Sequence, residues 1–507
     1  MELKGVKVAK FFRKLTIFAC MLCSDLVYRI REAFAPKIPN GEQLKAAEVF
    51  AQFMMDRTSD RTVMVLRGSA GTGKTTLAAA LVKALGTLGQ KLVLLAPTGR
   101  AAKVFSLYAG RPAFTIHRRI YRQQTAADLS AFRLNDNLHT DTLFIVDEAS
   151  MVSHAALNEM FGSGDVLSDL ISYVYQGQRC RLLLIGDAAQ LPPVGEQESP
   201  ALMGSVLRSY GLTVYEADVS EVLRQSRESG ILYNATMVRQ LITREATPLL
   251  PRLYLKGFAD ICVVPGDELI ERLASSYSRV GIDETVVICR SNKRANIYNM
   301  GIRNTVLDRE ELLSRGDQLM VVKNNYSLIS GNSQKGDEAA TQPSFLANGD
   351  RCVVFRVRHE EQLYGFRFAD VTLQFPDYDD YELTVKVILD TLTSESPALT
   401  HEQQEQLYNN VMADYADIPL KSERLKQLKS DAYYNALQVK YAYAVTCHKA
   451  QGGQWAHVYI DQGYMTDEML TADYVHWLYT ALTRATSQVY LVNWPQSQIC
   501  NERSEKL

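Results

Sequence analysis

The chain has 507 residues, of which 47% are hydrophobic and 22% charged, and its formal net charge is −2. This length exceeds one ordinary hydrophobic core, so we expect two or more domains, and the composition is typical of a globular rather than a disordered protein. The near-zero charge excludes a globally basic nucleic-acid coat, so any site for a polyanion must be a local groove.

The first 37 residues predict a leading helical segment. Basic residues, among them Lys7, Lys10, Arg13 and Lys14, precede the apolar run Leu15–Cys23, and charged residues resume at once from Asp25. The run is short, and these charges stand before the only small-residue pair, at Ala33 and Ala35, so we expect an amphipathic helix rather than a signal peptide. No other stretch reaches the ~18 apolar residues that a membrane span requires.

The eight cysteines are scattered, and Cys20 and Cys23 form the lone C-x-x-C pair. Because no second pair or nearby histidine completes a zinc set, we interpret this spacing as a coincidence on a helix face rather than as a metal or redox site. Scattered cysteines in a long chain suit a reducing compartment, and we expect the protein in the cytoplasm.

Short apolar runs alternate with helical patterns along two parts of the chain. In the first part, from Asn40 to Arg227, the runs are Val63–Arg67, Lys91–Ala96, Leu143–Val146 and Arg181–Ile185. In the second part they are Thr285–Cys289, Tyr441–Val445, Val458–Asp461 and Gln488–Val492. This alternation predicts two parallel sheets, each covered by helices.

A phosphate-binding loop follows the first apolar run. The eight residues of the motif G-x-x-x-x-G-K-[ST] are Gly68, Ser69, Ala70, Gly71, Thr72, Gly73, Lys74 and Thr75, and Thr76 opens the helix behind them. Glycines let backbone N–H groups turn toward a triphosphate at the helix N-terminus. Lys74 is then placed to reach the outer phosphates, and the Thr75 hydroxyl to bind Mg²⁺.

Polar residues also follow the next buried runs. Asp147 and Glu148 come after Leu143–Val146, where Asp147 can hold Mg²⁺ and Glu148 can polarise the attacking water, although the two acids could instead cap the next helix. Gln190, in Gly186–Gly195, is an amide suited to contacting both the terminal phosphate and the water. These motifs together predict nucleotide hydrolysis, with ATP as the default substrate.

The region between the two parts of the second sheet has a different composition and hydrophobic pattern. Ser327–Pro343 is rich in Gly, Ser and Asn and predicts a loop, whereas Phe345–Leu389 alternates apolar and polar residues and predicts a small antiparallel barrel. Thr400–Ser430 is charged with a helical pattern. We interpret the acidic residues Asp377–Glu382 as an exposed hairpin turn rather than as a metal site.

At least seven ordered motifs over Asn40–Trp494, the inserted region excepted, resemble those of superfamily 1 helicases of the RecD-like branch. Besides the three motifs above, they include Pro97–Ala102, Thr115–His117, Val222–Gln225, Ala444–Gly452 and Tyr479–Ala485. The resemblance implies two RecA-like parallel-sheet P-loop domains in tandem, of the α/β class, with an SH3-like β-barrel inserted in the second.

For the nucleotide, the resemblance implies that Gln43 reads the adenine edge, although on sequence alone it could simply start a helix. It implies that Arg224 and Arg484 are the two arginine fingers, each of which in isolation would suit a surface salt bridge. Gln451 and Gly452 are implied to lie near the nucleotide.

For the strand, the resemblance implies contacts to the backbone without base reading. The implied residues are Thr98, Arg100, His117, Asn292, Thr446, His448 and Lys449. A duplex-separating wedge would lie at about 118–141, with Phe132 or Leu134 as its apolar tip, unless these two side chains belong to the core.

We therefore expect a helical segment at 1–37, a first motor domain at 38–257, a second at 258–335 and 436–507, and the insertion at 336–435. The predicted function is an ATP- and Mg²⁺-dependent 5′→3′ DNA helicase, acting as a monomer on single-stranded DNA and its junctions with duplex. The alternatives are an RNA-directed helicase of the same superfamily, a P-loop ATPase subunit of a DNA-repair complex, and a small-molecule P-loop kinase.

Overall fold

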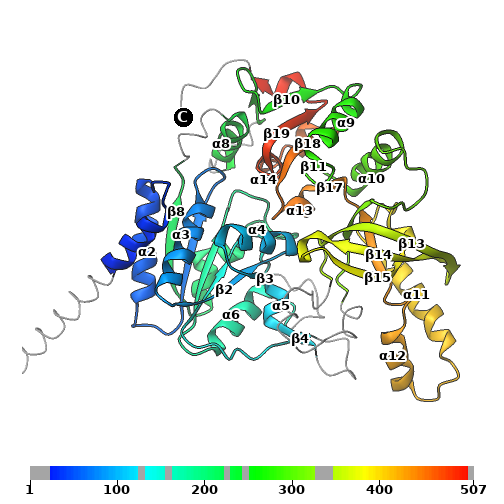
Figure 1. The fold of residues 1–507 in the computed structure, drawn as a ribbon, viewed down its shortest axis with the longest axis horizontal. Helices are drawn as coiled ribbons and strands as arrows, with labels where there is room; N and C mark the ends of the chain where they lie inside the picture. The colour runs from blue at the N-terminus through cyan, green and yellow to red at the C-terminus, as the bar shows by residue number, and fades with distance from the viewer. Residues whose placement is uncertain are drawn as a thin grey trace, which may run out of the picture.

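The computed structural model describes residues 23–123, 132–154, 163–221, 229–242, 250–325 and 346–500. Two α/β domains lie one above the other in Figure 1, and a β-barrel with a helical extension projects to their right. No helix among these residues is both long enough and apolar enough to cross a lipid bilayer.

The first domain is built on a parallel sheet with the strand order β3-β2-β6-β7-β1-β8. Its strands are β1 (Thr62–Gly68), β2 (Lys91–Ala96), β3 (Ala113–Thr115), β6 (Thr142–Val146), β7 (Arg181–Gly186) and β8 (Thr213–Val219). Two separate hydrophobic clusters cover the two faces. Burial on both faces explains why these strands are unbroken apolar runs rather than alternating ones.

Helices cover both faces of this sheet. They are α2 (Gly41–Met55), α3 (Lys74–Thr87), α4 (Gly99–Ala109), α5 (Ile116–Ile120), α6 (Val166–Gln176) and α7 (Gly204–Ser209), with short 3₁₀ turns η1 (Ala149–Met151) and η2 (Pro200–Leu202). Residues 23–33 form the described part of a leading helix. Leu26 and Ile30 of that helix are buried in one cluster with Phe50 of α2, so its apolar face packs on the first domain.

The second domain is a smaller parallel sheet with the order β10-β19-β18-β11-β17. Its strands are β10 (Ile261–Val264), β11 (Thr285–Cys289), β17 (Ala444–Thr446), β18 (Trp455–Asp461) and β19 (Ala485–Val492). Its helices are α8 (Gly230–Ile242), α9 (Leu269–Val280), α10 (Asn292–Gly301), α13 (Cys447–Ala450) and α14 (Ala472–Leu482), with η8 (Asp467–Met469) and η9 (Gln496–Gln498). The two parallel sheets agree with the expected fold class.

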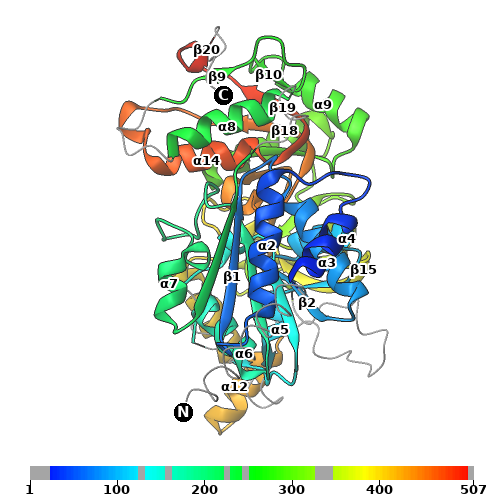
Figure 2. The same ribbon diagram turned by 90° about the vertical axis from the view of Figure 1, so that its left-hand side faces the viewer.

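Helix α8 lies with the second domain although we expected the first domain to continue to residue 257. Its residues Ile231, Ala235 and Val238 share a hydrophobic cluster with strand residues of the second sheet. Figure 2 shows α8 alongside α14, and β9 (Leu253–Tyr254) pairs with β20 (Ile499–Cys500) near the C-terminus. The packing therefore changes from the first core to the second before α8.

The barrel is closed and has five strands, β12-β13-β14-β15-β16. The expected segment supplies the three middle strands, β13 (Arg351–Leu363), β14 (Phe366–Phe375) and β15 (Tyr381–Ile388). The other two, β12 (Gln318–Val321) and β16 (Leu437–Tyr441), come from sequence that we expected in the second motor domain. They pair with each other and with β13 and β15, which removes the two open edges that three strands alone would leave.

The remaining elements surround the barrel and the first sheet. Thr400–Ser430 forms the expected helices, α11 (His401–Asp414) and α12 (Lys421–Ser430), and the short helical turns are η4 (Ile302–Val306), η6 (Pro376–Tyr378) and η7 (Leu389–Thr391). The expected wedge region contains the two short antiparallel strands β4 (Tyr121–Gln123) and β5 (Phe132–Leu134). The expected loop Ser327–Pro343 lies outside the described residues.

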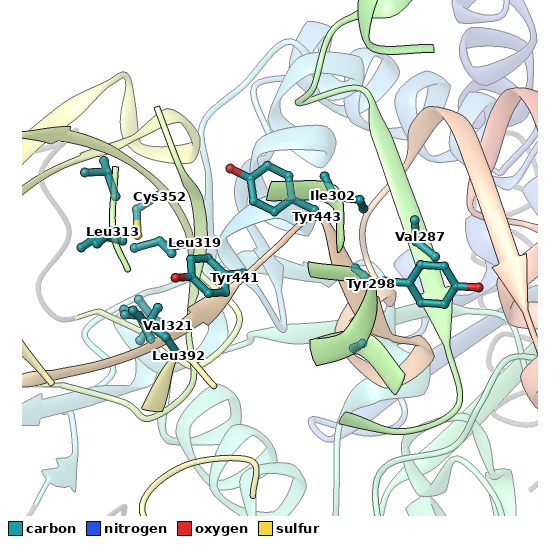
Figure 3. Close-up of a cluster of buried hydrophobic side chains, with 14 of the residues drawn as sticks. Val287, Tyr298, Ile302, Leu313, Leu319, Val321, Cys352, Leu392, Tyr441 and Tyr443 are labelled. Atoms are coloured by element: carbon teal, nitrogen blue, oxygen red, sulfur yellow. The ribbon is translucent and has the colours of Figure 1, made fainter. Parts of the chain in front are cut away.

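A buried charged cluster joins the barrel to the second sheet. Asp317, fully buried, accepts two hydrogen bonds of 3.0 Å from Arg303, one of 2.7 Å from Arg309 and one of 2.8 Å from the Tyr443 hydroxyl. Figure 3 shows the hydrophobic cluster that contains Tyr443, which runs from the barrel to Val287 of the second sheet. The charge and hydrogen bonds of Asp317 offset the free-energy cost of removing the Arg303 guanidinium from water.

Substituting Asp317→Asn should therefore destabilise the barrel and the second sheet together. The change leaves the buried Arg303 guanidinium without a full counter-charge, which costs about 3–5 kcal/mol of unfolding free energy. Urea unfolding followed by far-ultraviolet circular dichroism measures the loss. Asp141→Asn is the matched control, because its partner Arg179 is exposed at the surface, and equal unfolding midpoints for both variants would contradict the prediction.

Candidate functional site

The phosphate loop joins the end of β1 to the start of α3. Gly71 and Gly73 have φ angles of 78° and 79°, in the left-handed region that favours glycine. A Cβ at Gly68 would lie 2.7 Å from Cγ of Lys74 and 2.9 Å from the Val219 backbone oxygen. The loop needs these glycines to bring its amides to the N-terminus of α3, where the helix dipole favours an anion.

The cation of this loop is held by groups of the same domain. The Lys74 ammonium donates to the Gly68 carbonyl and lies 3.6 Å from Oδ2 of Asp187, which is 2% exposed at the end of β7. Thr75, in the first turn of α3, is exposed. The Lys74 ammonium, the Asp187 carboxylate and the exposed Thr75 hydroxyl therefore all lie beside the phosphate loop, at the carboxyl-end edge of the sheet.

The acidic pair follows β6, which lies between β2 and β7 in the sheet. Oδ2 of Asp147 accepts a hydrogen bond from the Tyr108 hydroxyl, and Oδ1 accepts one of 2.9 Å from the Glu148 amide. Burial, and next the charge of Glu148, raise the pKa of Asp147 to about 6. Glu148 has a φ of 52°, which turns its side chain out of the line of the strand.

The Gln190 loop is fastened to the second domain through its backbone. The Leu191 amide donates 2.8 Å to Oγ1 of Thr480, and the Leu191 carbonyl accepts 2.6 Å from the amide of Gln451. The ring nitrogen Nδ1 of His476 lies 2.9 Å from the Ala189 carbonyl. Gln190 itself is 5% exposed, and its Oε1 atom accepts no hydrogen bond from the described residues.

Tyr479 of α14 makes the contact that links the second domain to the phosphate loop. Its hydroxyl donates to Oδ2 of Asp187 at 2.6 Å and accepts from the Ala70 amide at 2.9 Å. Burial and the Asp187 carboxylate hold the pKa of this phenol well above its usual value, so the phenol keeps its proton. One hydroxyl thus joins two separate loops of the first domain to a helix of the second.

The structure describes one of the two expected arginine fingers, Arg484. Arg224 lies outside the described residues. Arg484 is 3% exposed and donates to carbonyls of its own domain, those of Thr480 at 3.2 Å and Gly453 at 3.3 Å. In this conformation Arg484 contacts the segment behind the groove described below rather than the phosphate loop.

Gln43 combines a helix cap with a contact to the loop. Its Oε1 accepts 3.0 Å from the Asn40 amide, completing a capping box, and its Nε2 donates 3.0 Å to the Thr72 carbonyl. The helix-start interpretation of this glutamine is therefore what the structure contains, and adenine reading stays a prediction.

A groove of about 740 Å³ lies where the two domains and the barrel meet. The first domain contributes Thr98 and Arg100, and the barrel contributes the turn at Asn348 and Gly349 with Arg351. The second domain contributes Arg290, Ser291, Asn292, Lys293, Thr446, His448, Lys449, Gln451, Gly453 and Trp455. All the predicted strand-contacting residues except His117 line this groove.

Cationic side chains from both domains and the barrel line the groove together with apolar side chains and one acid, Glu395. The Arg100 guanidinium lies 4.3 Å from the Trp455 ring centroid, and that of Arg351 lies 5.9 Å from it. Burial, and next the charge of Lys440, lower the pKa of Lys449 to about 8. A local basic groove in a chain of net charge −2 is the arrangement expected of a site for a polyanion.

Two predicted residues lie elsewhere than expected. His117 is on α5, where burial lowers the pKa of its imidazole to about 4, and its ring packs 5.7 Å from that of Tyr121. Gly452 has a φ of 71°, and a Cβ there would lie 3.1 Å from both Oγ1 of Thr98 and Cβ of Ala101. Gly452 is thus at the close approach of the two domains beside the groove.

Several contacting residues were not among the predicted site residues. Tyr479 and Thr480 belong to a recognised motif, but inside a helix both resemble core positions. Asp187 belongs to the Gln190 motif. Their presence in ordered motifs was the available signal, whereas Arg239 of α8, which donates to the Ser69 hydroxyl, stands in no motif that we identified.

Two family models match separate parts of the chain. A family model described as an AAA domain matches residues 40–246, and one described as a UvrD-like helicase C-terminal domain matches residues 441–492. The ATP-dependent RecD2 DNA helicase of Deinococcus radiodurans is 36% identical over 146 residues, which are 28% of this chain and 18% of that protein.

Two further similarities cover other shares of the chain. The ATP-dependent DNA helicase dda of Enterobacteria phage T4 is 29% identical over 189 residues, 35% of this chain and 37% of that protein. A crystal structure of the Pif1 helicase from Bacteroides, with ADP-AlF3 and single-stranded DNA, covers 92% of this chain and 95% of its own with a TM-score of 0.45 and 15% identity. The matches thus span well under half the length of the two curated relatives.

Removing the Tyr479 hydroxyl should loosen the phosphate loop in the nucleotide-free protein. In Tyr479→Phe the Ala70 amide loses its acceptor, worth ~1 kcal/mol, so its hydrogen exchange should quicken about fivefold. Hydrogen–deuterium exchange read on a peptide containing residues 68–73 measures this. Tyr464→Phe, on a side chain that is 84% exposed, is the control, and unchanged exchange in Tyr479→Phe would contradict the assigned contact.

Proposed function

We propose that this chain, which belongs to the superfamily 1 helicases of the RecD-like type, is an ATP-driven motor that moves 5′→3′ on single-stranded DNA and unwinds duplex. The observation that carries the proposal is that a phosphate loop and a basic groove lie at the same seam. Helix α14 of the second domain touches the loop through Tyr479. The groove is lined from both domains and the barrel, so motion at the seam changes both sites.

For hydrolysis, the loop amides and Lys74 bind the phosphates of ATP, and Glu148 polarises the attacking water. Thr75 and Asp147 fit a magnesium site, because an exposed hydroxyl and a carboxylate are oxygen ligands next to the loop. When bound, Mg²⁺ supplies positive charge that offsets the charge of the outer phosphates. Gln190, with a buried oxygen that accepts no hydrogen bond from the part of the chain that the structure describes, is placed to contact the water or the terminal phosphate.

For strand binding, the groove residues contact the DNA backbone. Arg100, Arg351 and Lys449 provide cations, and Thr98 and Thr446 provide hydroxyls. Such contacts neutralise phosphates without reading base edges, so binding is salt-dependent and tolerant of sequence. The Arg100 guanidinium lies over the Trp455 ring and donates to the Gln454 carbonyl, so two contacts fix its position in the groove wall.

Coupling follows from which side of the seam each residue belongs to. Thr98 and Arg100 move with the first domain, whereas Thr446, His448 and Lys449 move with the second. Opening and closing of the seam during ATP turnover changes the spacing between these two groups, which shifts the strand. We assign the first motor domain to the residues before α8, and α8 with the second sheet to the second motor domain.

Substituting Lys74→Ala should abolish ATP hydrolysis that is stimulated by single-stranded DNA, because the ammonium that meets the outer phosphates is lost. Release of phosphate, with and without an oligonucleotide, measures the rate. Lys83→Ala, an exposed lysine on the same helix, is the control. Normal turnover in Lys74→Ala would contradict the motor assignment, stimulation by RNA alone would favour the RNA-directed alternative, and phosphate transfer to a small molecule would favour the kinase.

The affinity for single-stranded DNA should fall as the pH rises through 8. The pKa of Lys449 in the free protein is about 8, so the charged form that binds phosphate predominates below this pH and is lost above it. Fluorescence anisotropy at constant salt should show about a fivefold or greater loss from pH 7 to 9. Lys449→Arg should remove most of the change and Lys256→Arg should not; equal pH profiles in all three proteins would refute this role for Lys449.

A further inference from the structure

Helix α8 presents an arginine to the phosphate loop from the second domain. Nη1 of Arg239 donates a hydrogen bond to the Ser69 hydroxyl, at the second position of the loop. Seven residues earlier, Leu232 packs on the same loop, since a Cβ at Gly71 would lie 3.2 Å from Cδ2 of Leu232. Positions seven apart lie on one face of a helix, so α8 turns this face to the loop at two points.

Arg239 is a cation beside the phosphate loop. Among the described residues, no Asp or Glu oxygen lies within ion-pair distance of its guanidinium, and the side chain is half-buried. Its charge also acts on the phenol of Tyr479, whose hydroxyl holds the Ala70 amide. Arg239 therefore lies beside the Ser69–Ala70 end of the loop. The acceptor of its hydrogen bond is the neutral Ser69 hydroxyl, which the phosphate of an incoming nucleotide can replace.

Arg239 differs in this respect from Arg484. The Arg484 guanidinium is almost fully buried and donates to carbonyls of its own domain. The Arg239 guanidinium crosses the seam, because α8 packs in the second core while Ser69 belongs to the first domain. Among the described arginines of the second core, Arg239 is thus the one with a contact on the phosphate loop itself.

We propose that Arg239 is a phosphate-binding arginine of the motor. Its guanidinium leaves the Ser69 hydroxyl, contacts the terminal phosphoryl group of bound ATP, and neutralises the charge that develops there during hydrolysis. In that step the water oxygen bonds to the terminal phosphorus, the bond to the bridging oxygen breaks, and ADP, phosphate and one proton are released. Arg239 keeps its own proton throughout. This inference rests on the proposed ATP hydrolysis.

The test compares Arg239→Ala and Arg239→Lys with Arg279→Ala, which removes an exposed arginine from α9 of the same domain. Loss of a donor to the reacting phosphoryl group should lower kcat of the DNA-stimulated ATPase about 100-fold or more in Arg239→Ala. Binding of a fluorescent ADP analogue, which lacks the terminal phosphoryl group, should change less than about threefold by the same principle of transition-state contact. Arg239→Lys should restore only part of the rate, since its ammonium lacks the planar fork.

Added guanidinium chloride, at concentrations that leave the wild type folded, should raise the rate of Arg239→Ala but not that of Lys74→Ala, because it can fill only the space that the arginine leaves. A rate in Arg239→Ala within about threefold of the wild type would overturn the inference, as would equal loss of ADP binding and turnover without rescue. A wild-type protein that hydrolyses no ATP with single-stranded DNA would instead refute the proposed function.

Discussion

One tyrosine hydroxyl fixes how the two motor domains meet. The Tyr479 hydroxyl is a donor to Asp187 and an acceptor from Ala70 at once, and both partners are loop residues at the carboxyl ends of strands in the first sheet. A parallel sheet brings such ends to one edge, so a single side chain of α14 can reach both. Because Asp187 also lies 3.6 Å from the Lys74 ammonium, the position of α14 bears on the cation of the phosphate loop.

The barrel completes the groove because it contacts both domains. On the second domain the Asp317 cluster holds it, and on the first the Gly99 end of α4 meets its turns, where a Cβ would lie 2.8 Å from the Tyr378 hydroxyl and 2.9 Å from Oδ1 of Asp350. The Lys103 ammonium also donates to the Pro376 carbonyl. Three bodies thus share the walls of one groove, and displacement of any one of them alters the other two contacts.

Local sequence predicted the elements whose signal is local. Strands buried on both faces are apolar throughout, and the phosphate loop must place glycine at fixed positions, so both were recognisable. Strands β12 and β16 were not assigned to the barrel because their pairing joins Leu319 to Tyr441, far apart in the chain, and no local pattern encodes that partner. Likewise, the amphipathic pattern of α8 does not indicate which of the two sheets it packs against. Tyr479 lies within a helix and resembles a core residue until the hydrogen-bond partners of its hydroxyl are known.

The surroundings of Arg484 indicate what closure of the seam requires. Its three donated bonds, to Thr480, Gly453 and Thr483, are 3.2–3.3 Å long, and each such bond from a charged group is worth about 1.5–3 kcal/mol. An arginine that leaves these acceptors leaves buried carbonyls behind, so it needs a strong anion to move toward. Arg239 gives up only a hydroxyl. The two arginines therefore differ in the free energy needed to leave their present acceptors, and Arg239 is the less constrained of the two.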